Sequence, residues 1–128
     1  MEARKIIITG GATRIGAAIA EKLSGPNKEI TIHYNQSKSK AERLKKTLQK
    51  IGTVVHLVKG DLSKERDIHR IVKFSKSKMK FFDCLINNAS LFENDKLENF
   101  SSSSWEKHIS TNLKAPALLS KEFSKNVR

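Results

Sequence analysis

The chain has 128 residues, of which 38% are hydrophobic and 30% charged. This length allows one domain with a hydrophobic core that needs no disulfide or metal. No apolar run approaches the roughly 18 residues of a membrane span, so membrane-spanning and collagen-like proteins are excluded. Cys84 is the only cysteine, which excludes an intramolecular disulfide. The charged N-terminus does not resemble a secretory signal, and we expect a cytoplasmic protein.

The net charge of +12 comes mainly from lysine. A basic surface is compatible with nucleic-acid binding. However, the basic residues are spread over several segments and lack the arginine and aromatic side chains that contact bases. We therefore favour a lysine-rich solvated surface that attracts small anionic ligands, and we do not expect a nucleic-acid partner.

Strand-like and helical patterns alternate along the chain. Short β-branched or apolar runs predict strands at residues 4–9, 29–34, 53–58 and 82–86. Helical spacing predicts helices at 14–24, from a cap at Ser37 or Ser39 to about 51, and from about Ser63 to 79. Ser104 is expected to cap a short helix at 105–110, and a longer helix is expected from about Asn112. The order predicts a doubly wound α/β fold, with a parallel sheet that binds its ligand at the carboxyl ends of the strands.

A glycine-rich turn follows the first predicted strand. It has the sequence Thr-Gly-Gly-Ala-Thr-Arg-Ile-Gly over residues 9–16 and leads into a helix. Such a turn lets the backbone approach a pyrophosphate, and the helix N-terminus offers free N–H groups and a partial positive charge. A plain glycine turn is the alternative, but the other strand ends also carry polar segments, at 33–37, 60–63 and 87–90.

These four segments together resemble the short-chain dehydrogenase/reductase family. Its glycine turn, its Asp-Leu after the third strand (Asp61, Leu62) and its Asn-Asn-Ala after the fourth (residues 87–89) occur here in the same order. Asn112 stands where the family has its active-site asparagine. The resemblance covers essentially the whole chain. It implies a Rossmann fold over residues 1–128 that binds NAD(P) and is incomplete at its C-terminal side.

Several residues resemble the pteridine reductase branch of that family. Arg14, the pair His33 and Tyr34 ahead of Ser37, and Ser90 after Asn-Asn-Ala carry this likeness. Asn35 and Gln36, by contrast, stand where that branch has His-Arg. The second strand has no acidic residue at its end to bind an NAD ribose. We therefore expect NADP rather than NAD, with its 2′-phosphate near Arg14, Ser37 and Lys38 or Lys40.

The resemblance implies a role for each site residue. Gly10, Arg14, Ile15 and Gly16 would line the pyrophosphate, while Tyr34, Asn35 and Ser37 would contact the adenosine phosphate. Asp61 and Leu62 would contact adenine, and Asn88, Ala89 and Ser90 would lie beside the nicotinamide ribose. Phe92 would stack on a pterin substrate or, equally, pack onto the core. Asn112 would hold a water of the proton relay, act as a helix N-cap, or do both. The histidines show no metal-ligand spacing, and no metal is expected. Cys84 is expected in the core, and Trp105 as a helix anchor.

The family transfers a hydride with the help of a serine and a Tyr-x-x-x-Lys pair, and these are not found in the 128 residues. Tyr34 is the only tyrosine. We interpret the chain as the N-terminal half of a reductase of carbonyls or pterins, with a small-molecule substrate. The alternatives are an inactive NADP-binding module or gene remnant and, less favoured, a basic nucleic-acid-binding protein. We expect exposed apolar residues on the last helix, such as Leu113, Leu118, Leu119 and Phe123. A family-type dimer or tetramer would form through residues 112–125.

Overall fold

The sheet is built from short segments rich in β-branched residues. A computed structural model describes residue 2 and residues 4–127 of the chain. Its four strands are β1 (Lys5–Ile8), β2 (Glu29–Tyr34), β3 (Val54–Lys59) and β4 (Cys84–Ile86). All of them pair in parallel, in the order β3-β2-β1-β4. The predicted parallel sheet is confirmed.

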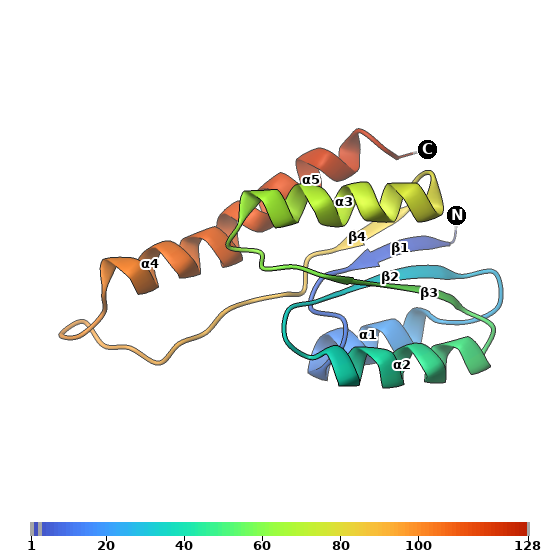
Figure 1. Ribbon diagram of the computed structural model, residues 1–128, viewed down its shortest axis with the longest axis horizontal. Helices are drawn as coiled ribbons and strands as arrows, with labels where there is room; N and C mark the ends of the chain where they lie inside the picture. The colour runs from blue at the N-terminus through green and yellow to red at the C-terminus, as the bar shows by residue number, and fades with distance from the viewer. Residues whose placement is uncertain (1, 3, 128) are drawn as a thin grey trace.

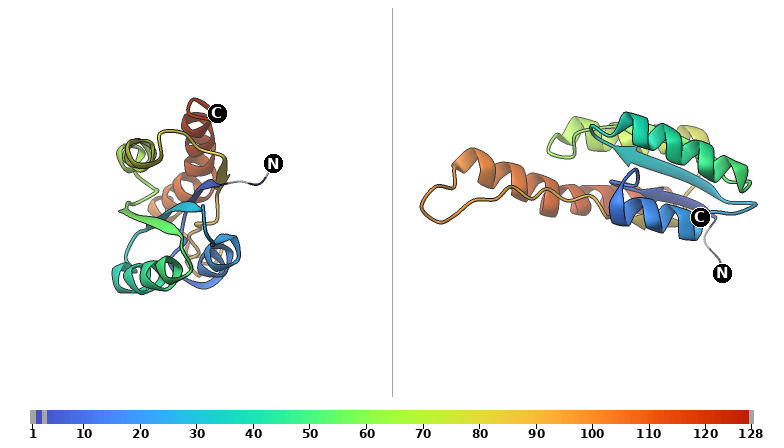
Figure 2. Two further views of the ribbon diagram at one scale, coloured as in Figure 1. Left: turned by 90° about the vertical axis from the view of Figure 1, so that its right-hand side faces the viewer. Right: turned by 90° about the horizontal axis from the view of Figure 1, so that it is seen from below.

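Helices cover both faces of this sheet (Figure 1). One face carries α1 (Arg14–Leu23) and α2 (Lys38–Lys50), and the other carries α3 (Glu65–Met79) and α5 (Ala115–Ser124). The left view of Figure 2 shows these layers end-on. Helices on both faces of a parallel sheet make the fold doubly wound, as predicted.

Each face of the sheet has its own hydrophobic core. Successive strand residues point to opposite faces, so Ile6 and Ile8 enter the core under α1 and α2, whereas Ile7 enters the core under α3 and α5. All three are fully buried. The α3-side core also contains Phe82, whose ring stacks on Phe123 of α5 with 5.7 Å between the ring centroids.

The last helix differs from the prediction. Instead of two helices divided near residue 111, one continuous helix runs through α4 (Ser102–Ile109), the π-helical turn η1 (Ser110–Lys114) and α5. Its N-cap is Ser101 rather than Ser104, and the Ser101 hydroxyl accepts a hydrogen bond from the Ser104 N–H at 3.0 Å. Asn112 lies inside η1, so its interpretation as a helix N-cap is wrong.

The apolar residues of α5 are also placed differently from the prediction. Leu119 is only 1% exposed, and Leu118 and Phe123 pack against the α3-side core. Among the four leucines and phenylalanines named from the sequence, Leu113 is the one that stays largely exposed. Trp105, expected as a helix anchor, is 57% exposed, and its ring lies beside that of Phe100 in the loop before α4, with 6.4 Å between the ring centroids.

The segment from residue 87 to the end of α4 projects away from the sheet (Figure 1). It consists of an irregular loop that runs outward and of α4, which returns beside it (Figure 2, right). Within the described part of the chain, no helix has the length and apolar character needed to cross a membrane.

Candidate functional site

The carboxyl ends of all four strands lie at one edge of the sheet, because the strands are parallel. The turn at residues 9–16 follows β1, and the segment at 87–92 follows β4, its neighbour in the sheet. Side-chain hydrogen bonds join these two segments directly. We call this edge, with the N-termini of α1 and α2, the nucleotide edge.

Thr9 and Asn88 connect the two segments. The Thr9 hydroxyl accepts the backbone N–H groups of Asn88 and Ala89, each at 3.1 Å. In return, the Asn88 side-chain amide donates to the carbonyl oxygens of Thr9 and Gly10, also at 3.1 Å. Asn88 therefore fastens the segment after β4 to the glycine turn.

Two glycines allow the turn to fold tightly against α1. Gly10 has a φ of +60°, a conformation that few residues other than glycine adopt. A Cβ at Gly16 would lie 2.1 Å from the Gly10 carbonyl oxygen and 2.6 Å from Nδ2 of Asn88. The first turn of α1 therefore packs directly on the glycine turn. Gly16 excludes a side chain, and a Cβ at Gly10 would come within 3.0 Å of the Ala89 Cα.

The N-terminus of α1 suits an anion. Thr13, the N-cap residue, makes no hydrogen bond with its side chain, and the first turn carries no acidic residue. Arg14 is exposed and adopts a φ of +52°, and Ile15 is 71% exposed. Free N–H groups, the helix dipole and a guanidinium thus occur together. This arrangement fits a pyrophosphate.

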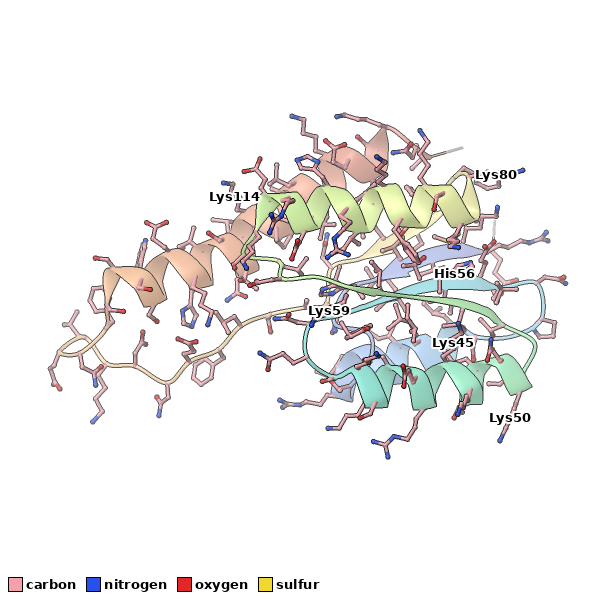
Figure 3. All side chains as sticks on the ribbon, in the orientation of Figure 1. Lys45, Lys50, His56, Lys59, Lys80 and Lys114 are labelled. Atoms are coloured by element: carbon pink, nitrogen blue, oxygen red, sulfur yellow. The ribbon has the colours of Figure 1, made fainter. Side chains whose placement is uncertain are left out.

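The segment after β2 also favours a negative ligand. Tyr34 ends the strand, Asn35 is exposed, and Ser37 is the N-cap of α2 but makes no capping hydrogen bond with its side chain. The first turn of α2 has no acidic residue, and Lys38 and Lys40 are exposed on it. The helix terminus and these lysines give this part of the nucleotide edge a positive potential. Lys59, at the end of the neighbouring β3, adds to it (Figure 3).

The segment after β3 carries an ionised carboxylate in a tight turn. Asp61 Oδ1 accepts hydrogen bonds from the hydroxyl and the N–H of Ser63, at 2.7 and 3.0 Å. The Ser63 hydroxyl is the main cause of the lowered pKa of Asp61. Leu62 is buried in the α3-side core, so its side chain does not lie on the open surface that a bound adenine would occupy.

His33, named from the sequence for its likeness to the pteridine reductase branch, has no role at this edge that the sequence predicts. It is 3% exposed, and its ring nitrogens lie 3.1 Å from the Gly10 N–H nitrogen and 2.8 Å from the Gly60 carbonyl oxygen. A signal was available, because His33 lies at a buried position of a strand and buried polar groups are nearly always hydrogen-bonded.

Asn112 is committed to the backbone of Leu91. Its Oδ1 accepts the Leu91 N–H at 2.7 Å, and its Nδ2 donates to the Leu91 carbonyl at 2.8 Å. The π turn that carries Asn112 is a rare form of helix that often occurs at functional sites. Asn112 thus fastens the segment after β4 to the last helix, which is the contact that the structure shows for this side chain.

Phe92 lies farther out, on the projecting segment. Its side chain is 84% exposed, so the expectation that it packs onto the core is wrong. With Leu97, Phe100 and Trp105 it lines a mainly apolar cavity of about 530 Å³ between the loop and α4. His108 closes one side of this cavity and binds the loop, because its Nε2 accepts the Glu93 N–H at 3.1 Å.

Among the described residues, no group of histidine, cysteine, aspartate and glutamate side chains could hold a metal. Cys84 is half-buried beside the core under α1 and α2, and burial raises the pKa of its thiol.

The family model described as "short chain dehydrogenase" matches residues 4–128. The chain belongs to the short-chain dehydrogenase family. Among curated proteins, the short-chain dehydrogenase/reductase FrzI of Cladobotryum sp. is 31% identical over 113 residues, which cover 88% of this chain and 44% of the relative. This chain therefore spans about half the length of the curated relatives that it matches.

Solved structures of short-chain dehydrogenases have the same fold. One from Burkholderia cenocepacia, in complex with NADP, matches 97% of this chain and 51% of its own with a TM-score of 0.92 at 22% identity. FolM alternative dihydrofolate reductase 1 from Brucella canis, complexed with NADP, matches 96% of this chain and 50% of its own with a TM-score of 0.87 at 32% identity. The sequence-based assignment to the short-chain dehydrogenase family is confirmed, whereas the pteridine reductase branch is not decided by these matches.

Proposed function

We propose that residues 1–128 are the N-terminal, dinucleotide-binding part of a short-chain dehydrogenase that uses NADP. The observation that carries this proposal is the positive nucleotide edge, where the N-termini of α1 and α2 lie without an acidic residue in either first turn. An acidic residue at the end of β2 would bind the ribose of NAD and repel the 2′-phosphate of NADP. The strand instead ends at Tyr34, and Asn35 follows it.

The residues of the nucleotide edge would divide the dinucleotide between them. Gly10, Arg14, Ile15 and Gly16 would surround the pyrophosphate, and Ser37 with Tyr34, Asn35 and the neighbouring lysines would receive the 2′-phosphate. Asp61 and Leu62 would border adenine, with Leu62 offering its backbone because its side chain is buried. Asn88, Ala89 and Ser90 would border the nicotinamide ribose. The bound cofactor would supply the hydride for reduction.

We propose a carbonyl compound or a pterin-type ring as the substrate of the whole enzyme. Phe92 is exposed and borders an apolar cavity, so a flat aromatic ring could stack on it. The similarity to FolM, named an alternative dihydrofolate reductase and 32% identical over its matched part, supports the pterin class. Asn112 would keep the segment after β4 beside the substrate and support the proton relay.

Nucleotide binding tests this proposal directly. NADPH should bind at least about tenfold more tightly than NADH, because a hydrogen bond to a charged group contributes about 1.5–3 kcal/mol. Arg14→Ala should reduce that difference in Kd, whereas Arg43→Ala, which removes an exposed arginine from the middle of α2, should leave it unchanged. Equal Kd values for the two nucleotides in the unmodified protein would refute the assignment to NADP.

A second candidate is an NADP-binding module that does no chemistry of its own. Within residues 1–128, Tyr34 ends β2 on the adenosine side and Lys38 begins α2, so this pair is not placed to assist hydride transfer. NADPH binding without NADPH oxidation, in the presence of a pterin or a dicarbonyl substrate, would support this candidate.

A further inference from the structure

His33 joins the ends of three strands at the nucleotide edge. It lies on β2, and its neighbours in the sheet end in Gly10 after β1 and Gly60 after β3. Gly10 N–H donates to His33 Nδ1, and His33 Nε2 lies 2.8 Å from the Gly60 carbonyl oxygen. The backbone carbonyl of His33 also accepts the N–H of Gly11 at 3.0 Å. His33 therefore accepts hydrogen bonds from two consecutive N–H groups of the glycine turn.

These partners allow only one form of the ring. A carbonyl oxygen cannot donate, so Nε2 must carry a hydrogen for Gly60. An N–H group cannot accept, so Nδ1 must be unprotonated to receive Gly10. Neutral histidine with the proton on Nε2 satisfies both contacts. A protonated ring would place an N–H on Nδ1 directly against the N–H of Gly10, and that contact would break.

We propose that His33 is a positioning residue for the dinucleotide: its neutral ring fixes the glycine turn after β1, and protonation of the ring releases Gly10 and weakens cofactor binding. This inference rests on the proposed function, because it assigns an effect on NADPH affinity to a residue that is buried beneath the site. His33 would act through Gly10 without touching the nucleotide.

The surroundings of the ring determine where this change occurs on the pH scale. Burial is the main cause of the lowered pKa of His33. The hydrogen bond to Gly60 acts in the opposite direction, Arg70 of α3 lowers the pKa further, and Asp67 of α3 and Asp61 after β3 raise it. The neutral form therefore persists below the usual histidine pKa of about 6.5. NADPH affinity should be constant near pH 7.5 and should fall as the pH drops through the pKa of His33.

Two substitutions, each keeping a polar atom near one ring nitrogen, separate the two hydrogen bonds. In His33→Asn, Oδ1 stands at the position of Nδ1 and can accept Gly10 N–H, but the side chain does not reach Gly60. In His33→Gln, the amide nitrogen stands at the position of Nε2 and can donate to Gly60, but Gly10 loses its acceptor. At pH 7.5 we expect His33→Asn to stay within about threefold of the unmodified Kd for NADPH, because Gly10 keeps its acceptor. We expect His33→Gln to lose about tenfold, which equals about 1.4 kcal/mol, because Gly10 of the glycine turn loses its acceptor.

The pH dependence distinguishes positioning from general structural support. In His33→Asn, NADPH affinity should no longer fall at low pH as a result of ring protonation. In His56→Asn, it should still fall as in the unmodified protein. His56 is a matched control because it binds Glu29, at the opposite end of the strands from the nucleotide edge (Figure 3). A profile that His33→Asn leaves unchanged, or equal losses of affinity in His33→Asn and His33→Gln, would overturn the inference.

Nuclear magnetic resonance on the unmodified protein gives a test that needs neither a variant nor a cofactor. The ring nitrogens of His33 should show the tautomer with the proton on Nε2 at pH 7.5, and the Gly10 amide resonance should move with the titration of His33. The opposite tautomer, or a Gly10 resonance that ignores this titration, would overturn the positioning of the turn. If the unmodified protein binds no NADPH at any pH, the proposed function and the effect on affinity are both refuted. The Gly10 resonance would still show whether the His33 ring holds the glycine turn.

Discussion

Two residues, Gly16 and Arg14, determine the shape and the charge of the glycine turn. Gly16 leaves no room for a methyl group beside the Gly10 carbonyl. Arg14 has a left-handed backbone conformation, which costs a residue other than glycine about 1–2 kcal/mol. Its guanidinium stands at the N-terminus of α1, where an anion is favoured. Strain and charge are therefore combined at one residue, as is common at binding sites.

Gly16→Ala should destabilise the protein and abolish nucleotide binding. Alanine is favoured over glycine inside a helix by about 1 kcal/mol, but forcing extra atoms into a packed site costs about 1–3 kcal/mol. Here the obstacle is backbone, which cannot rotate away, so the clash should prevail. Urea unfolding would measure the change, with Glu21→Ala on the exposed side of α1 as the control. An unfolding free energy higher than that of the unmodified protein would contradict this packing.

Arg14→Gly should separate the effect of backbone strain on stability from the effect of the guanidinium charge on nucleotide preference. Glycine relieves the left-handed conformation, and its larger freedom in the unfolded chain offsets about 0.5–1 kcal/mol of that gain. We expect an unfolding free energy equal to the original or up to about 1 kcal/mol higher, while the preference for NADPH over NADH declines. Chemical denaturation and nucleotide titration measure the two effects. A clear loss of stability would show that the Arg14 side chain contributes to the fold itself.

The site residues that belong to a sequence motif could be predicted. Contacts that depend on the packing of distant segments could not. The glycines and Asn88 follow a recognisable order, and the structure brings them into contact. The motif includes His33 but does not predict the two hydrogen bonds that its ring makes. Its two partners lie 23 and 27 residues away in the sequence. Only the register of three strands brings them together.

Among the elements, the last helix has the largest effect on the shape of the site. Its π turn carries Asn112, whose two hydrogen bonds hold Leu91. The strands and the first three helices could be predicted within one or two residues from alternation and helical spacing. The π turn could not, because Asn112 and Pro116 are as compatible with a new helix as with a continuous one. The packing of Leu119 and Ala115 on the α3-side core accompanies the continuous helix.

Asn112→Ala should free the segment after β4. Two hydrogen bonds to Leu91 are lost, each with a net contribution of about 0.5–1.5 kcal/mol. Hydrogen exchange of the Leu91 amide should accelerate, with little change in the exchange of the sheet. Asn99→Ala is a suitable control because Asn99 accepts a hydrogen bond within its own turn, from the Lys96 N–H. Unchanged protection of Leu91 would indicate that another contact holds this segment.

The N-terminus of α3 should make the protein sensitive to acid. The Asp61 N–H donates to Asp67 Oδ2 at 2.8 Å and is the main cause of the lowered pKa of Asp67. A carboxyl whose pKa is lower in the folded state stabilises the fold above its unfolded value of about 3.9. That contribution is lost as the pH falls through the lower, folded value. Asp67→Asn should flatten this part of the curve of unfolding free energy against pH, and an unchanged curve would contradict this role of Asp67.

On the scale of the whole molecule, apolar surface is distributed unevenly. The body exposes Ile15, Ile51, Val54 and Val127, whereas the short projecting segment alone exposes five large apolar side chains, those of Phe92, Leu97, Phe100, Trp105 and Ile109. Clusters of this kind favour association. Since Leu119 and Phe123 are packed against the α3-side core, self-association would depend on α4 and its loop rather than on all of residues 112–125.

Trp105→Glu should weaken self-association. We expect the unmodified protein to sediment faster as its concentration rises, and the variant to sediment as a monomer over the same range. Ile51→Glu replaces another exposed apolar residue, at the end of α2 and away from the projecting segment, and should sediment like the unmodified protein. A concentration-independent monomer in all three proteins would show that the exposed cluster does not drive association.

Because of the strand order, β1 must wait during translation until β4 has been synthesised. β1 pairs with β2 and β4, and Ile6 lies beside Cys84 in the sheet although 78 positions separate them along the chain. A ribosome that adds about 5–20 residues per second needs roughly 4–16 s to cover that distance. Throughout this interval the backbone N–H and C=O groups on the β4 side of β1 have no strand to pair with. Slow codons between α3 and β4 would prolong the exposure, and a chaperone that binds extended apolar segments would have its best opportunity there.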